Sequence, residues 1–322
     1  MPEMSYLDAI REAQIEEMRR DESVIIMGQD LRASLYGNAG LADLFGDQRV
    51  RDVPTSETAC VGAALGAAMT GLRPVMDMTS ASFCFVAMDQ FVSEVSKARY
   101  ATNGRLRLPV TYRVGVIYEG GVGVQHSDRP HPWFMSMPGL KVMSPTTPAD
   151  ARAMLKAAVR DDDPVIFIED TYCWSMKGEV GQGADDVVDV GSAAIRRSGD
   201  DVTAVGIGRA ALFAQQAAEE LADEVSVEVI DLRSLAPIDW DTVFTSVEKT
   251  GRLLVVDPAV RICSAASEIA ATVGERRFGA LRAPIRRLTS PMVHTPFSPA
   301  LEKGMYPDVP KVVRALRELV EA

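Results

Sequence analysis

Residues 57–78 read ETACVGAALGAAMTGLRPVMDM and contain one helix candidate followed by one strand candidate. The helix candidate, 59–69, is rich in glycine and alanine, although each glycine inside a helix costs roughly 1 kcal/mol relative to alanine. Close approach of another backbone offsets such a cost, and that backbone belongs either to the sheet of the same domain or to a neighbouring subunit. The strand candidate, 74–78, is a short apolar run of the kind that lies buried in a parallel sheet.

The same alternation continues on both sides of this stretch. Further strand candidates are 24–27, 109–116, 141–144 and 165–168, and further helix candidates are 6–20, 83–100 and 148–160. Ser5 is placed to cap the first of these helices and Thr147 the last. Alternating strands and helices predict an α/β fold with a doubly wound parallel sheet.

The pattern breaks at 178–187 (GEVGQGADDV), a run rich in Gly and Asp without periodicity, and then starts again. The second series has strand candidates 202–207, 227–232, 253–256 and 285–288, and helix candidates 210–222, 240–250, 264–273 and 309–319. We therefore expect two domains, 1–190 and a smaller α/β domain at 191–322, as suits a chain of 322 residues.

Composition argues against several classes of protein. The chain is 47% hydrophobic and 25% charged with a net charge of −11, which is typical of a globular protein and argues against a nucleic-acid partner. No apolar run approaches a membrane span of about 20 residues, and no apolar signal core begins the sequence, so a cytoplasmic location is expected. The four cysteines lack metal-site spacing and are expected to be small buried side chains: Cys60, Cys84, Cys173 and Cys263.

Glu57 is the first candidate for chemistry, because it lies between a predicted strand end and the Gly/Ala helix. Ligands of open α/β sheets bind at the carboxyl ends of strands. A partly desolvated carboxylate at that position can share a proton with a ring nitrogen. The alternative is that Glu57 is only an N-terminal helix residue favoured by the helix dipole.

His126 is the second candidate. It follows the Gly-rich run 120–123, which comes after the strand candidate 109–116, and glycines let a backbone approach a ligand closely. An imidazole at a strand-end loop can act as an acid or a base near neutral pH, although a lone histidine is also a common structural residue. The sequence contains no G-x-S-x-G elbow, no P-loop, no H-E-x-x-H and no G-x-G-x-x-G fingerprint.

A series of further motifs runs in order from about residue 6 to residue 319. They are DVPTSE (52–57), GLRPV (71–75), AMDQ (87–90), KARY (97–100), VQHS (124–127), PGLKV (138–142), RDDDPV (160–165), VIDLRSLAP (229–237) and PFSPALE (296–302). Together they resemble the β subunit of the thiamine-diphosphate-dependent, decarboxylating component of 2-oxo acid dehydrogenases. That family, which includes pyruvate, branched-chain 2-oxo acid and acetoin dehydrogenases, belongs to the transketolase-like superfamily.

The resemblance implies a pyrimidine-binding domain followed by a domain like the C-terminal domain of transketolase. It implies that Glu57 meets a ring nitrogen of the cofactor's aminopyrimidine, that Phe83 packs on that ring, and that His126 assists proton handling. Thr55, Thr79 and Gln29 are the further cofactor-binding residues that it implies.

The resemblance also implies a partner. The family's diphosphate and Mg²⁺ motif, Gly-Asp-Gly, belongs to an α subunit, and neither Gly46-Asp47 nor Gly199-Asp200 continues to Gly here. The resemblance therefore implies an α2β2 assembly. It implies that Mg²⁺ is held mainly by the α subunit and that this chain holds no metal. It also implies a lipoyl-bearing acyltransferase as the acceptor.

Several positions depart from the family pattern and leave the substrate open. Gln29 replaces a common Glu, the stretch 128–134 (DRPHPWF) is unusual, the loop 78–82 is small and polar, and 262–266 replaces a Gly-rich segment in a manner closer to acetoin dehydrogenases. A split transketolase-like or acyloin-forming enzyme without a lipoyl partner, and a non-catalytic scaffold, are the alternatives. Asp161 and Asp163 match a stretch where some relatives bind a monovalent cation, and a solvated acidic helix end is the other interpretation.

Overall fold

The computed structural model describes residues 1–33 and 36–322, which form two compact units. The first unit comprises Met1–Tyr118 and Gln125–Val190, and the second comprises Glu119–Val124 and Gly191–Ala322. The Gly-rich segment ahead of His126 thus packs with the second unit, whereas His126 itself belongs to the first.

The first unit is built on a parallel sheet with the strand order β6-β7-β5-β4-β2-β3. Its strands are β2 (Val24–Gly28), β3 (Val50–Asp52), β4 (Arg73–Asp77), β5 (Thr111–Val116), β6 (Lys141–Met143) and β7 (Val165–Asp170). All residues of β2, β5 and β7 are buried, as expected for strands covered by helices on both faces. A separate antiparallel pair joins β1 (Glu3–Ser5) to β8 (Lys177–Glu179).

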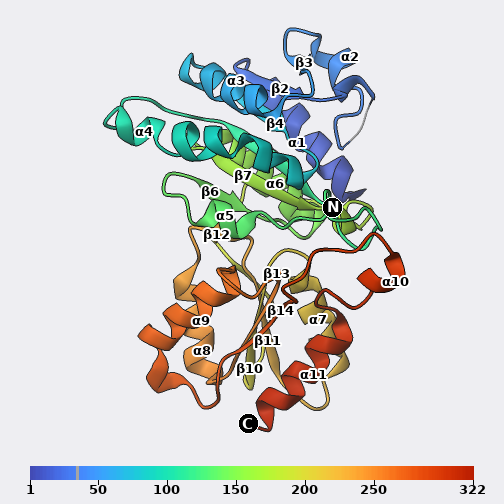
Figure 1. Ribbon diagram of the computed structural model, residues 1–322, viewed down its shortest axis with the longest axis vertical. Coiled ribbons are helices and arrows are strands. Elements are labelled where there is room, and N and C mark those ends of the chain that lie inside the picture. Colours follow the sequence, from blue (N-terminus) through green and yellow to red (C-terminus); the bar gives the residue numbers. More distant parts are fainter. Residues whose placement is uncertain (34–35) are drawn as a thin grey trace. The chain divides into compact units, whose positions relative to one another are not determined.

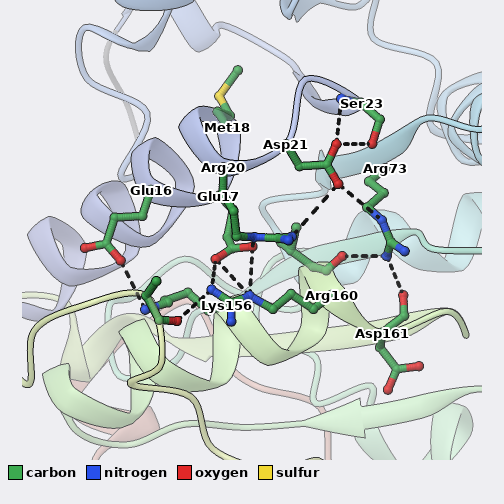
Figure 2. A network of polar contacts seen from close by, with 12 residues as sticks. Glu16, Glu17, Met18, Arg20, Asp21, Ser23, Arg73, Lys156, Arg160 and Asp161 are labelled. Carbon is green, nitrogen blue, oxygen red and sulfur yellow. Dashed lines mark hydrogen bonds and ion pairs between the residues drawn. The ribbon is translucent and has the colours of Figure 1, made fainter.

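Helices cover both faces of this sheet (Figure 1). They are α1 (Tyr6–Arg20), α2 (Leu41–Phe45), α3 (Glu57–Met69), α4 (Ala98–Ala101), α5 (His131–Met135) and α6 (Pro148–Arg160), with short turns η1 (Leu31–Ala33), η2 (Ala81–Ala87), η3 (Gln90–Val95) and η4 (Thr171–Cys173). The two predicted caps are confirmed, because Ser5 accepts from the Asp8 N–H and Thr147 from the Asp150 N–H, each at 3.1 Å. Helices α1 and α6 lie side by side and share the polar network of Figure 2.

The helix predicted at 83–100 is helical over most of its length but is not one regular α-helix. The segment is divided into the 3-10 turn η2, the π-helical turn η3 and the short helix α4. The Ser96 hydroxyl donates to the carbonyl of Val92 at 2.9 Å, a local bond that competes with the regular helical ladder. The break places Phe83 on a turn rather than on a long helix.

The second unit has its own sheet, in the order β14-β13-β10-β11-β9, which is parallel except for the edge strand β9. The strands of this sheet are β9 (Ala194–Arg197), β10 (Val202–Gly206), β11 (Val227–Asp231), β13 (Leu253–Val260) and β14 (Arg286–Ser290). The short strand β12 (Ser234–Ala236) is not part of it. Its helices and turns are α7 (Ala210–Glu220), α8 (Trp240–Thr250), α9 (Ala265–Arg276), η5 (Phe278–Ala280), α10 (Pro299–Glu302) and α11 (Val309–Val320).

In this unit α7 and α11 pack on one face of the sheet, around a core that contains Phe213, Val229 and Leu316, and α8 and α9 lie on the other face (Figure 1). Both units therefore have the α/β architecture that the sequence predicts. None of the helices within 1–33 and 36–322 combines the length and the hydrophobicity that a membrane span requires.

Candidate active site

A small pocket of about 160 Å³ lies in the first unit where strands β2 and β4 end. Four of the residues proposed from the sequence line it: Gln29, Glu57, Thr79 and Phe83. The sequence did not single out the others, which are Asp30, Tyr36, Cys60, Met76, Asp77 and Met78. The carboxyl ends of parallel strands are the usual place for ligands in such sheets, so the pocket lies where chemistry is expected.

Glu57 is half-buried and is the first residue of α3, so its carboxylate also lies at the positive end of the helix dipole. The Gln29 amide donates to Glu57 Oε1 at 3.4 Å, and the Thr55 hydroxyl donates to Gln29 Oε1, also at 3.4 Å. Thr55 is exposed and touches the pocket only through this chain of hydrogen bonds. Glu57 therefore both begins helix α3 and lines the pocket, so the two interpretations of this residue are compatible.

Phe83 and His126 lie edge to face, with ring centroids 5.4 Å apart and an interplanar angle of 75°. The loop after His126 is also tied to the turn that carries Phe83, since the Asp128 N–H donates to Ser82 Oγ at 3.3 Å. His126 does not line the pocket itself but contacts the aromatic side chain that does. The six proposed residues thus form one connected group in the first unit.

Cys60 is a pocket residue that the sequence treated as a simple core side chain. Burial raises the pKa of its thiol, and the nearby Glu57 carboxylate adds to the effect. Cys60, Cys84 and Cys173 are buried as predicted. The same prediction is wrong for Cys263, which is exposed on the turn between β13 and α9 with φ at 54°.

A buried charge cluster lies directly behind the pocket. Asp77, on β4, is paired in register with Arg113 on β5, and Arg113 donates to Glu169 on β7 at 2.6 and 3.1 Å. Burial raises the pKa of the Glu169 carboxyl, which Arg113 offsets only in part because Asp77 adds a second negative charge. These charged residues interrupt otherwise apolar strands, and that interruption is the signal that could have identified them from the sequence.

Gly28 makes room for this cluster. A Cβ at that position would lie 2.9 Å from the Cβ of Asp77, on the neighbouring strand, so only glycine fits there. Gly115 has the same role for Thr79, whose methyl carbon would lie 2.8 Å from an added Cβ.

The two aspartates considered for a cation site lie in ion pairs. Lys141 Nζ lies 2.7 Å from Asp161 Oδ1 and 3.1 Å from Asp163 Oδ2, and Asp163 also pairs with Arg99. Burial opposes the charge of Lys141, but the hydrogen bonds that it donates to both aspartates outweigh this effect and raise the lysine pKa. Within the described part of the chain, no group of three or more His, Cys, Asp or Glu side chains is arranged to hold a metal ion.

A larger hollow of about 800 Å³ lies beside these aspartates and includes Tyr100 and Asn103, but none of the residues proposed from the sequence for the cofactor. Of its charged lining residues, Arg99 and Asp163 form an ion pair with each other, and Lys97 is the third. The smaller pocket is therefore the better candidate for an active site, because its polar groups converge on one small space.

Comparison with known proteins gives this arrangement a class. Residues 2–171 match the family described as the pyrimidine binding domain of transketolase, and residues 191–312 match the C-terminal domain of transketolase. A solved split-gene transketolase, described as an inactive β4 tetramer, superposes with a TM-score of 0.81 at 21% identity over 99% of this chain and 98% of the other. The two-domain transketolase-like fold expected from the sequence is confirmed.

Curated relatives identify a smaller family within the transketolase-like proteins. The chain is 41% identical to the 2-oxoisovalerate dehydrogenase subunit beta of Bacillus subtilis (strain 168), over all of both chains. It is 39% identical to the acetoin:2,6-dichlorophenolindophenol oxidoreductase subunit beta of the same organism (98% of this chain, 97% of the relative) and 39% identical to the pyruvate dehydrogenase E1 component subunit beta of Rhizobium meliloti (strain 1021) (98% and 70%). The chain belongs to this family of dehydrogenase β subunits, which confirms the resemblance seen in its motifs.

Proposed function

We propose that this chain is the β-type subunit of a thiamine-diphosphate-dependent enzyme that cleaves a 2-oxo acid or acetoin. The observation that carries the proposal is the Glu57 carboxylate, which lines a small pocket opposite strand-end residues and accepts a hydrogen bond from Gln29. The names of the relatives support a dehydrogenase subunit.

The residues of the pocket fit the aminopyrimidine end of that cofactor. Glu57 supplies a carboxylate for a ring nitrogen, Phe83 supplies an aromatic surface for the ring, and Thr79 is a further lining residue. Gln29 and Thr55 orient Glu57 through their hydrogen-bond chain. The bound cofactor would supply a nucleophilic carbon that attacks the substrate carbonyl and accepts its electrons. His126, held against Phe83, would move protons near the reacting atoms.

A pocket of about 160 Å³ is smaller than the roughly 300–1,000 Å³ of most ligand sites, so it suits one ring rather than a whole cofactor. We infer that an α subunit supplies the diphosphate and Mg²⁺ site, in an α2β2 assembly. Within this chain we assign 1–190 to pyrimidine binding and 191–322 to the domain like the transketolase C-terminal domain. A lipoyl acyltransferase as acceptor and a cytoplasmic location stay predictions.

The relatives favour a dehydrogenase subunit over a split transketolase-like or acyloin-forming enzyme and over a silent scaffold. The connected group around Glu57 and His126 also argues against a scaffold, because a silent subunit has no need to retain it. The identity of the acceptor separates the enzyme classes: a lipoyl domain, an aldehyde, or a dye alone.

The test is to copurify the chain with its α partner and to titrate thiamine diphosphate and Mg²⁺ by calorimetry. The isolated chain, the Glu57→Gln complex and a Glu268→Gln complex are compared, since Glu268 is also an acidic residue in the first turn of a helix, α9. We expect the parent complex to bind and to turn over 2-oxo acids or acetoin with a dye acceptor.

Glu57→Gln should retain the assembly and lose at least about 100-fold in turnover, the size typical of removing one group that handles a proton in the reaction. Glu268→Gln should match the parent. A parent complex that assembles but binds no cofactor would contradict the proposal and leave the scaffold interpretation in its place.

A further inference from the structure

Arg113 is a fully buried cation for which the proposed chemistry has no use. Its side chain is 1% exposed, and it projects from the centre of β5 toward α1, opposite in direction to its neighbour Tyr112, whose hydroxyl reaches the Val61 carbonyl of α3. A buried arginine is costly unless every N–H finds a partner. The positions of those partners therefore show what the residue holds together.

The guanidinium of Arg113 contacts three groups of hydrogen-bond partners. Nε and Nη2 donate to the two oxygens of Glu169, Nη2 also donates to the Tyr36 carbonyl at 2.7 Å, and Nη1 lies within 3.5 Å of Gln14, Asn38 and Asp77 oxygens. The planar fork of an arginine suits this arrangement, which a lysine ammonium cannot reproduce.

Two of these groups of partners belong to segments that line the pocket. Tyr36 lines the pocket, and the loop that contains it begins directly after β2 with Gln29, the partner of Glu57. On the other side, Asp77 accepts from the Thr79 N–H at 3.1 Å and from Asn38 Nδ2 at 2.8 Å. Thr79 belongs to the loop that leads into the turn with Phe83.

We propose that Arg113 is a positioning residue that fixes the distance between these two loops, and so sets the width of the pocket that receives the aminopyrimidine. Gln29, Asp30 and Tyr36 line the pocket from one side of the tie, and residues of 77–83 line it from the other. One buried guanidinium contacts Tyr36, Asp77 and Glu169 together. The inference rests on the proposed function for the identity of the ligand, whereas the tie between the two loops is independent of it.

A matched control exists in the same unit. Arg152, on α6, is also fully buried and also has two acidic partners, Glu16 at 2.5 Å and Asp186 at 2.6 Å, but neither of these residues lines the pocket. Arg113→Lys and Arg152→Lys thus make the same chemical change at two buried arginines, although the acidic partners of Arg152 are partly exposed and those of Arg113 are not. General destabilisation affects both variants, whereas loss of positioning affects only Arg113→Lys.

The first readout is hydrogen–deuterium exchange on the full-length chain without cofactor. In Arg113→Lys we expect exchange to rise by about tenfold or more in peptides that report on the amides of 36–40 and of 77–83, because their shared anchor is lost. In Arg152→Lys those peptides should exchange as in the parent. The second readout is the calorimetric Kd of the α–β complex for thiamine diphosphate with Mg²⁺, which Arg113→Lys should weaken about tenfold or more.

Asp77→Asn keeps the test decisive if Arg113→Lys does not fold. The substitution preserves the shape of the side chain but places an amide N–H where Asp77 accepts from Asn38 and Arg113. Because these hydrogen bonds are lost, hydrogen–deuterium exchange should rise in 77–83. Unchanged protection in both loops, or an effect equal to that of Arg152→Lys, overturns the positioning role. A parent complex that binds no thiamine diphosphate overturns the proposed function instead, and the exchange data still decide the role of Arg113.

Discussion

The first unit contains two buried charge networks that differ in how they are enclosed. One lies between α1 and α6, where Glu17 is 1% exposed but its partners Arg160 and Arg20 are 26% and 39% exposed (Figure 2). The other surrounds Arg113, whose partners Asp77 and Glu169 are 4% and 2% exposed. The first, called the helix network below, joins Glu16 and Glu17 of α1 to Arg152, Lys156 and Arg160 of α6, whereas the Arg113 network joins the sheet to the loops of the pocket.

This difference in enclosure determines whether water can solvate a charged side chain that loses its partner. In the helix network water can replace a lost partner, since the arginine head groups reach the surface. In the Arg113 network two carboxylates share one guanidinium out of reach of solvent, so no member can lose its partner without a large penalty. We therefore expect the second network to be both the more fragile and the more closely linked to ligand binding.

Arg113→Met tests the comparison with the largest expected effect. It leaves two buried carboxylates without a counter-ion, and we expect a loss of about 3–5 kcal/mol in the free energy of unfolding, measured by urea denaturation. Arg160→Met is the control and should cost about 1–2 kcal/mol, because Glu17 retains Arg20. Equal losses would show that enclosure does not separate the two networks.

Glu17→Gln should have the next largest effect. The buried carboxylate accepts from Arg160 at 2.5 Å and from Arg20 at 2.7 Å, so a neutral amide should cost about 1–3 kcal/mol in the same measurement. Because the helix network does not reach the pocket, the Kd for thiamine diphosphate should stay at the parent value. A weakened Kd would mean that the two networks are coupled.

One carboxylate in each network should make the free energy of unfolding depend on pH, and the two dependences should have opposite signs. Burial opposes ionisation of Glu16, but hydrogen bonds from Arg152 and Lys156 outweigh it and lower its pKa, whereas burial raises the pKa of Glu169. A lowered carboxyl pKa contributes stability above the unfolded-state value of about 4.3 that is lost as the pH falls through the folded pKa. A raised pKa contributes stability below about 4.3 that is lost as the pH rises through the folded pKa.

Unfolding free energies of Glu16→Gln and Glu169→Gln, measured from about pH 3 to pH 7, check these signs, because the Glu16 contribution changes below about pH 4.3 and the Glu169 contribution above it. Relative to the parent, the deficit of Glu16→Gln should grow as the pH rises, and the deficit of Glu169→Gln should shrink. Parallel trends would contradict the assignment of one raised and one lowered pKa.

Arg20→Gln should have the smallest effect. Its side chain is 39% exposed and Glu17 keeps Arg160, so the change should cost less than about 1 kcal/mol and fade in high salt. A thermal unfolding series at low and high salt measures it. A loss as large as that of Glu17→Gln would mean that Arg20 is the main partner of the buried carboxylate.

Much of the fold could be predicted because apolar runs mark strands that are buried on both faces. The strand that contains Arg113 was predicted correctly from its apolar majority, and for the same reason its charged residue was overlooked. Glu57 could be selected because it stands at the junction of a strand end and a helix. Tyr36 could not, since its role depends on a backbone carbonyl in a loop without periodicity.

Pattern also fails where local bonding competes with the helix, as between Phe83 and Tyr100. Periodicity there predicts one regular helix, but the segment changes between 3-10, π and α geometry. The Ser96 hydroxyl occupies the Val92 carbonyl, and the Ser96 N–H donates to Phe91 instead. His126 was identified as a candidate from its neighbours in sequence, whereas its contact with Phe83 depends on how distant segments fold together.

The exposure of Cys263 has a practical consequence. The other three cysteines are buried, so a thiol-reactive dye applied to the native chain should attach at one position in the second unit. A fluorophore at that position would report on assembly with other chains through changes in its anisotropy. The chain thus already carries a single attachment point for spectroscopy, without any engineered cysteine.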